Sequence, residues 1–246
     1  MEDLTPRQIQ ILKSLVEEYT QTAEAVGSDV LEKKYSLGVS PATIRNEMAA
    51  LTAGGYLKQP HTSSGRIPTP KAIKLYVDQL MDEKKLSVTE EVAAKERVLG
   101  ARQDFDKMMH EATRALSQAT HSLAAAALEN GDTWHAGYSH ILDMPEFYNI
   151  DVTSHVLSLL EEARRLQEVF CQNAHWDEPF EILFGEELGW PHFEAVGMVT
   201  SHFTSPFGRG TLGVIGPVRF NYAAIIPTVR YFGDLISEAS AKWQEK

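Results

Sequence analysis

Up to about residue 54, apolar positions recur at helical spacing, broken by short polar turns. Apolar residues recur every three or four positions from Thr5 to about residue 19, which predicts a helix with a capping box at its start. A second helix is predicted from Gly27-Ser28, with Ser28 as its cap, and a third from Ser40 to Gly54. Residues 56–69 have prolines near both ends and a small polar tip, which predicts a hairpin confined to a sheet edge. This order of elements is typical of a winged helix-turn-helix.

A longer helical pattern follows the hairpin. Helices are predicted from Lys71 to about residue 84 and again from Thr89. From Phe105 to Ala126 the apolar steps alternate between four and three, which is heptad spacing. This stretch is either a dimer seam or a long helix packed on its own domain, and the pattern leaves both open. The seam positions are Phe105, Met109, Ala112, Leu116, Ala119, Leu123 and Ala126.

The last third of the chain mixes predicted strands and helices. Residues 130–138 are polar and predicted to be a connection, and residues 152–170 have the spacing of a helix. Short apolar runs predict strands at 180–184, 195–203 and 211–215, and a final helix is predicted from Asn221 to about residue 243, distorted in its first turns by Pro227. The predicted fold class is therefore α+β.

Charge changes this picture because it is unevenly distributed. The 246 residues have a formal net charge of -11, yet residues 33–77 hold seven basic residues and one acidic residue, which is a net +6. A basic face on an acidic protein suits docking to a polyanion, although a merely solvated face remains equally open. The single cysteine, Cys171, together with the lack of a long apolar run or an apolar leader, predicts a cytoplasmic protein.

Side chains suited to reading DNA lie in this basic stretch. Arg45 can make a bidentate contact with guanine, Asn46 can pair with adenine, and Arg66 can reach phosphates or a narrow minor groove. The alternatives are that Arg45 pairs with Glu47 on a solvated helix and that the hairpin is an ordinary surface turn. The predicted DNA-binding residues are Ser40, Ala42, Thr43, Arg45, Asn46, Lys58, His61, Ser63, Ser64, Gly65, Arg66, Lys71 and Lys74.

Two long runs resemble a known family. Residues 37–48, LGVSPATIRNEM, resemble the helix-turn-helix of HrcA repressors, and residues 59–69, QPHTSSGRIPT, resemble the HrcA wing. Looser resemblance resumes at Pro145-Glu146-Phe147, at Phe184-Gly185-Glu186-Glu187 and at residues 213–219. The chain is roughly a hundred residues shorter than expected for the family, with the gap before Pro145.

The resemblance implies a fold and a function. It implies a homodimeric repressor of chaperone genes that binds an inverted-repeat operator of the CIRCE type, releases it on heating and is assisted by a GroEL-type chaperonin. The implied organisation is a winged helix over 1–80, linking or dimerisation helices over 81–130 and a truncated GAF-like sensor domain with a reduced antiparallel sheet over 131–246. The heptad stretch is then a candidate for the missing dimer contacts.

Other functions find weaker support in the sequence. The pairs Cys171/His175 and His135/His140 do not complete a four-ligand zinc site, so no metal and no cofactor is predicted. Glu186-Glu187 lacks a partner nucleophile, and no enzyme is predicted. One alternative is a winged-helix regulator controlled by a small molecule, and another is a dimer scaffold that has lost DNA binding. The candidate pocket residues for the small molecule are Phe193, Val196, Met198, Phe203 and Phe207, although residues of this kind more often belong to a plain core.

Overall fold

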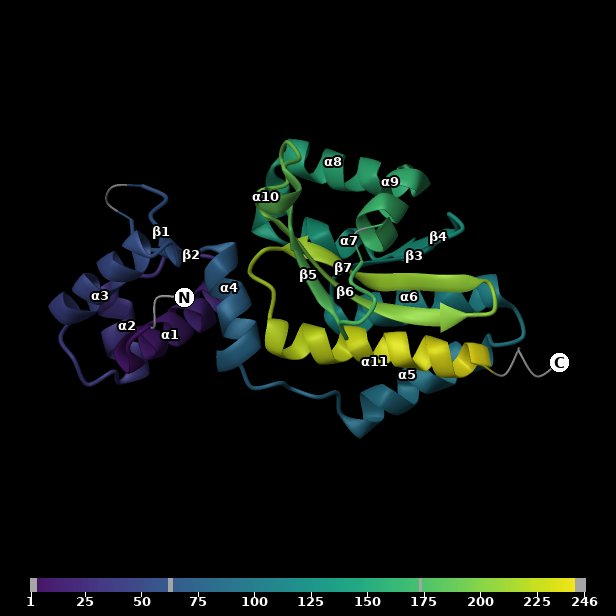
Figure 1. The fold of residues 1–246 in the computed structure, drawn as a ribbon, viewed down its shortest axis with the longest axis horizontal. Helices are drawn as coiled ribbons and strands as arrows, with labels where there is room; N and C mark the ends of the chain where they lie inside the picture. The colour runs from purple at the N-terminus through teal and green to yellow at the C-terminus, as the bar shows by residue number, and fades with distance from the viewer. Residues whose placement is uncertain (1–3, 62–63, 173, 242–246) are drawn as a thin grey trace. The chain divides into compact units, whose positions relative to one another are not determined.

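The chain forms two compact units, residues 1–82 and residues 83–246 (Figure 1). The structure is a computed structural model that describes residues 4–61, 64–172 and 174–241. Each unit has its own hydrophobic core, and each is described by itself below.

The N-terminal unit contains a short helical bundle followed by a two-stranded antiparallel hairpin (Figure 1). This arrangement confirms the predicted winged helix-turn-helix. In chain order its elements are α1 (Pro6–Thr22), α2 (Ser28–Tyr35), α3 (Pro41–Ala53), β1 (Leu57–Lys58), β2 (Ile67–Pro68), α4 (Pro70–Leu75) and a π-helical turn, η1 (Tyr76–Leu80).

Local capping explains where these helices begin. The Thr5 side chain accepts from the backbone N–H of Gln8, and the Gln8 side chain accepts from that of Thr5, as the sequence predicts. The Ser40 side chain likewise accepts from the N–H of Thr43 at the start of α3. The prediction for α2 was wrong by one residue, because Gly27 occupies the cap position and Ser28 is the first helical residue.

A buried carboxylate joins α2 to α1. Glu18 is 4% exposed, and it accepts hydrogen bonds from Lys34 Nζ at 2.6 Å and from the Tyr35 hydroxyl at 3.2 Å. Burial, followed by the hydrogen bond and the negative charge of Glu18, raises the pKa of Tyr35 to about 12. Because a buried charge needs partners, this contact fixes how the two helices pack.

The C-terminal unit is built on a five-stranded antiparallel sheet with the order β4-β3-β7-β6-β5. Its long central pair, β6 and β7, runs from Val196 paired with Pro217 to Ser205 paired with Gly208. The strands are β3 (Leu123–Leu128), β4 (Thr133–Ala136), β5 (Glu181–Phe184), β6 (Val196–Ser205) and β7 (Gly208–Pro217).

Helices cover both faces of this sheet (Figure 1). On one face lie α6 (Phe105–Thr120) and α11 (Tyr222–Ala241), with α5 (Val88–Gly100) packed on both. The other face is covered by α7 (Tyr138–Leu142), η2 (Pro145–Tyr148), α8 (Ile150–Glu161), α9 (Ala163–Gln167) and η3 (Glu168–Gln172), and the short α10 (Gly185–Leu188) follows β5. These layers confirm the predicted α+β, GAF-like class.

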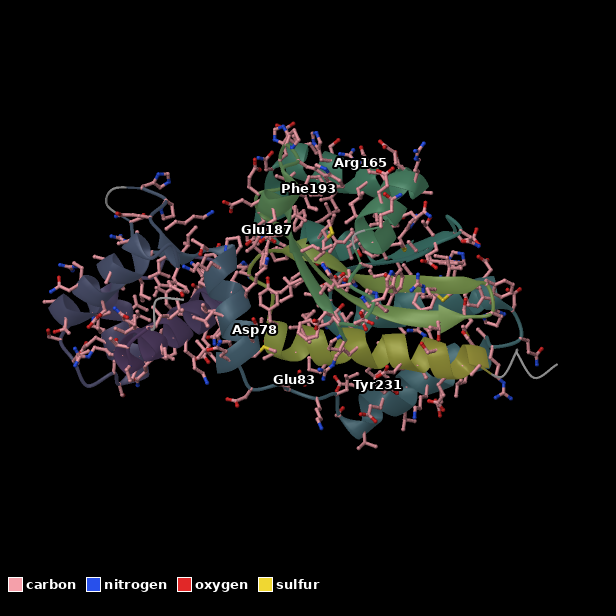
Figure 2. All side chains as sticks on the ribbon, in the orientation of Figure 1. Asp78, Glu83, Arg165, Glu187, Phe193 and Tyr231 are labelled. Carbon is pink, nitrogen blue, oxygen red and sulfur yellow. The ribbon has the colours of Figure 1, made fainter. Side chains whose placement is uncertain are left out.

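Polar contacts of α11 secure the first segment of the same unit. Figure 2 labels Glu83 and Tyr231, which take part in these contacts. The Tyr231 hydroxyl donates to the Glu91 carbonyl in α5 at 3.0 Å, and Arg230 pairs with Glu83 at 2.8 Å.

On the opposite side of the sheet Phe193 is 1% exposed and packs edge-on against Trp190. Over the described part of the chain, each helix is too short or too polar to cross a membrane.

The prediction of one helix from Phe105 to Ala126 was wrong. The helix α6 ends at Thr120, His121 adopts a left-handed φ of 48°, and Leu123–Leu128 is the strand β3. Four successive alanines favour a helix intrinsically, but here they lie in a strand buried on both faces, where small side chains let helices approach the sheet. The strand β4 was also missed, because residues 130–138 were predicted to be a connection.

Candidate nucleic-acid interface

Helix α3 separates an apolar face from a polar one. Ile44, Met48 and Leu51 are at most 4% exposed and pack into the core of the N-terminal unit. Arg45 and Asn46 are exposed, as are Ala42 and Ala49. The N-terminal half of this helix therefore presents long polar side chains between small ones, which is the surface that a major groove admits.

Arg45 is directed toward the start of α2. Its Nη2 lies 3.4 Å from Ser28 Oγ, and Ser28 itself is 6% exposed. Glu47 instead accepts from Arg7 at 3.5 Å and from Gln8 at 3.1 Å, both in α1. The alternative in which Glu47 pairs with Arg45 is therefore wrong, since side chains two positions apart on a helix do not face each other.

The hairpin, or wing, is tied to the helices at its base. Val26 and Arg66 exchange two backbone hydrogen bonds of 2.9 Å, forming an isolated antiparallel bridge. Gly65 makes this approach possible, because a Cβ there would lie 2.3 Å from the Val26 carbonyl oxygen. Ser64 Oγ accepts from the His61 N–H at 3.0 Å and donates to its carbonyl at 2.7 Å. Ser64 and Gly65 thus shape the wing, while the predicted contact residue Ser63 lies outside the described residues.

Arg45 and Arg66 line the same polar groove, of about 480 Å³. It lies between α3, the start of α2 and the base of the wing, and among the described residues that line it the acidic one is Asp29. The other lining residues are Gly27, Ser28, Met48, Gln59, Ser64 and Gly65. Two arginines, one in α3 and one at the base of the wing, therefore line one concave surface of a single unit.

The remaining predicted contacts differ in how they are held. Lys71 Nζ donates to the Gly54 carbonyl at 2.8 Å and lies 4.1 Å from the centre of the Tyr56 ring. Lys71 therefore closes the end of α3 as well as adding positive charge. Lys58, His61 and Lys74 are exposed. Ser40 and Thr43 contact each other through their hydroxyls at 3.0 Å.

The predicted dimer seam does not form a surface. Met109, Ala112 and Leu116 are completely buried, since α6 packs on α5, α11 and the sheet of its own unit. Leu123 and Ala126 are equally buried and belong to β3. Phe105 packs against Trp134 and Phe207 within the same unit, and Ala119 is exposed. The alternative, a helix packed on its own domain, is correct for residues 105–120 only, since the rest of the stretch enters the strand β3.

The predicted small-molecule pocket is also wrong. Phe193, Val196 and Met198 are at most 1% exposed and belong to the core between the sheet and α8. Phe203 is buried on the other face of β6, since it lies an odd number of residues from Met198, and Phe207 is 56% exposed. These five side chains do not line one cavity.

Metal or thiol chemistry finds little support in this unit. Within the described ranges, no three His, Cys, Asp or Glu side chains gather closely enough to hold a metal ion. Cys171 is 7% exposed, and burial raises the pKa of its thiol to about 11. Such a thiol remains protonated at neutral pH.

Sequence reasoning missed the residues that hold Arg66 and the neighbouring part of the wing. Thr52 in the last turn of α3 lies 3.2 Å from Arg66 Nε, and Gln59 donates to the Ser64 carbonyl at 3.1 Å. The helical spacing places Thr52 four residues after Met48, but nothing in the sequence pairs it with a residue 14 positions away.

Comparisons with known families match both units. A profile described as "Winged helix-turn-helix transcription repressor, HrcA DNA-binding" matches residues 3–81, and one described as "HrcA protein C terminal domain" matches residues 70–226. A heat-inducible transcription repressor HrcA of Geobacter sulfurreducens is 27% identical over 339 positions, covering 96% of this chain and 98% of that protein. Because the aligned span exceeds 246 residues, that relative contains residues that this chain lacks.

Other matches cover less sequence or show the fold alone. The HrcA protein of Clostridium tetani is 48% identical over 119 residues, which is 48% of this chain and 34% of that protein. A crystal structure titled as that of a hypothetical protein aligns with a TM-score of 0.75 at 16% identity, covering 98% of this chain and 99% of the other. At 16% identity, the match to this crystal structure supports the architecture and says nothing about activity.

Proposed function

The chain belongs to the HrcA family, and on this premise we propose that it is a sequence-specific DNA-binding repressor of heat-shock genes. The family is one of transcription regulators, which agrees with the absence of a predicted enzymatic centre. The curated relatives are named heat-inducible transcription repressors, and the chaperone genes are the targets that the resemblance implies.

The observation that carries this proposal is the shared groove of Arg45 and Arg66. A helix with exposed polar side chains is common on protein surfaces and does not by itself indicate DNA binding. Here the wing adds a second arginine, so that two basic side chains line the same groove. Arg45 then reads a base edge in the major groove, and Arg66 contacts phosphates or a narrow minor groove. The net +6 of residues 33–77 adds a sequence-independent attraction to the duplex.

We also propose a homodimer on an inverted-repeat operator of the CIRCE type. A two-fold symmetric operator matches a two-fold symmetric protein, which places one winged helix on each half-site. In this proposal the two copies contact each other elsewhere than along the apolar stripe of α6, because Met109, Ala112 and Leu116 are buried in their own unit. Assistance by a GroEL-type chaperonin is part of the same proposal and follows from the family alone.

Footprinting on an inverted-repeat duplex, with molar mass measured in parallel, tests the proposal. We expect protection of both half-sites, two protomers per duplex and affinity that falls steeply as salt rises. The control duplex keeps one half-site and scrambles the other. Equal affinity for the inverted repeat and for a fully scrambled duplex would overturn sequence-specific binding, and one protomer per duplex would overturn the dimer.

Temperature separates heat control from constant repression. The same footprint is followed as the sample is warmed, with and without an added chaperonin. Loss of protection before the winged helix unfolds supports heat-controlled release. Protection that persists until the whole protein unfolds contradicts it.

A further inference from the structure

We propose that Thr52 is a positioning residue for DNA binding, which aims the Arg66 guanidinium from the wing into the groove beside Arg45. This inference rests on the proposed DNA-binding function. It assigns a role to a side chain at the end of the recognition helix that itself contacts the wing and not the duplex.

The hydrogen bonds of Thr52 fix which atom is donor and which is acceptor. Its hydroxyl donates to the Met48 carbonyl at 2.7 Å, the bond back to the preceding turn that a helical threonine commonly makes. With its single proton committed there, Oγ1 presents lone pairs outward. Arg66 Nε–H donates to them at 3.2 Å. The arginine is therefore held by an acceptor whose direction is set by α3.

The rest of Arg66 is also fixed. Its backbone is bridged to Val26 through two 2.9 Å hydrogen bonds, and its Nη1 lies 3.5 Å from the Ser64 carbonyl. The contacts with Thr52 and Ser64 use two of the five guanidinium N–H groups. Arg66 is half-buried, so this side chain is oriented before any duplex arrives.

Orientation in advance raises affinity because an arginine loses rotamer freedom when it binds. Ordering a long side chain at an interface weakens binding by a few-fold to about tenfold, and a side chain already ordered avoids most of that loss. Thr52 also couples the two parts of the interface. It belongs to the helix that carries Arg45, so a shift of α3 carries the wing arginine with it.

Fluorescence anisotropy with a labelled inverted-repeat duplex tests the role of Thr52. Thr52→Val keeps the shape and removes the acceptor, and we expect it to weaken binding about 3- to 10-fold. Thr52→Ser keeps the hydroxyl and should restore wild-type affinity. In an Arg66→Ala background, Thr52→Val should have no further effect, because the residue that it positions is gone. Salt titrations of the single variants should show a lower slope for Arg66→Ala and a wild-type slope for Thr52→Val.

A second measurement does not depend on DNA. In the free protein we expect a slowly exchanging, NMR-visible Arg66 Nε–H signal, which is lost in Thr52→Val and kept in Thr52→Ser. Wild-type affinity of Thr52→Val, or full additivity with Arg66→Ala, would overturn the positioning role. If wild-type protein fails to discriminate the inverted repeat, the proposed function fails, while the Nε–H signal still decides whether Thr52 holds Arg66.

Discussion

Glu146 and Arg219 form a two-pronged ion pair in the C-terminal unit. Arg219 Nε donates to Glu146 Oε1 at 2.5 Å and its Nη2 donates to Oε2 at 3.1 Å, with side-chain exposures of 16% and 17%. The glutamate belongs to the Pro145-Glu146-Phe147 run and the arginine follows the end of β7. Two sequence runs that separately resemble the HrcA family thus meet in one contact.

Removing one charge of this pair should destabilise the C-terminal unit. Glu146→Gln removes the carboxylate charge that faces a mostly buried guanidinium, and we expect a loss of roughly 3 kcal/mol in the free energy of unfolding. Glu129→Gln is the matched control, since the Arg209–Glu129 pair is 52% and 42% exposed and should contribute below about 1 kcal/mol. Urea unfolding followed by tryptophan fluorescence measures this unit selectively, because all four tryptophans lie beyond residue 83. Equal effects of the two variants would contradict the prediction.

Arg45→Ala should relax base selectivity. If the guanidinium reads a guanine, its loss weakens specific binding by about 1–3 kcal/mol and reduces preference at one base pair. Competition binding with operators altered at single positions measures both effects. Lower affinity with an unchanged order of preference among these operators would mean that Arg45 does not read a base.

Lys71→Ala should weaken binding to all duplexes alike. Loss of one phosphate contact lowers the slope of log affinity against log salt by about one unit, without changing base preference. Because Lys71 also contacts the Gly54 carbonyl and the Tyr56 ring, thermal unfolding must be measured beside binding. Lys74→Ala removes a nearby exposed charge and serves as the comparison. A variant with lower stability but an unaltered slope would assign Lys71 to the fold alone.

Alkaline pH should destabilise the N-terminal unit. The pKa of Tyr35 is about 12 in the folded protein and about 10 when unfolded, so the folded state retains the proton longer. Its contribution to stability is therefore complete below pH 10 and lost as pH rises toward 12. Tyrosinate absorbance of the wild type against Tyr35→Phe isolates this titration. Ionisation of Tyr35 near pH 10 in a still-folded protein would show that burial and the contact with Glu18 do not raise its pKa.

The N-terminal unit was predictable from local signals. The cap Ser40 followed by Pro41, the buried spacing of Ile44 and Met48, and the prolines of the wing each act within a few residues, and the structure follows them. The Thr52–Arg66 contact was not predictable, since it depends on where the hairpin returns in space.

Strand β3 of the C-terminal unit shows the opposite case. Residues 123–128 have the composition of a helix and continue a heptad pattern, yet they pair with β4 and β7. Pairing with a strand that begins about 80 residues later, at Gly208, outweighs the local preference of alanine. The prediction of a dimer seam was wrong for a similar reason. Heptad spacing of apolar residues does not show whether they pack on their own domain or on a second copy of the chain.

The bridge between Val26 and Arg66 gives the wing a mechanical property. Swinging the hairpin away from the helices would break two backbone hydrogen bonds and separate Gly65 from the chain that it touches. The hairpin is therefore expected to move together with α2 and α3 as one rigid body. A duplex must then fit α3 and the wing at the same time, so DNA with an altered groove width should bind more weakly.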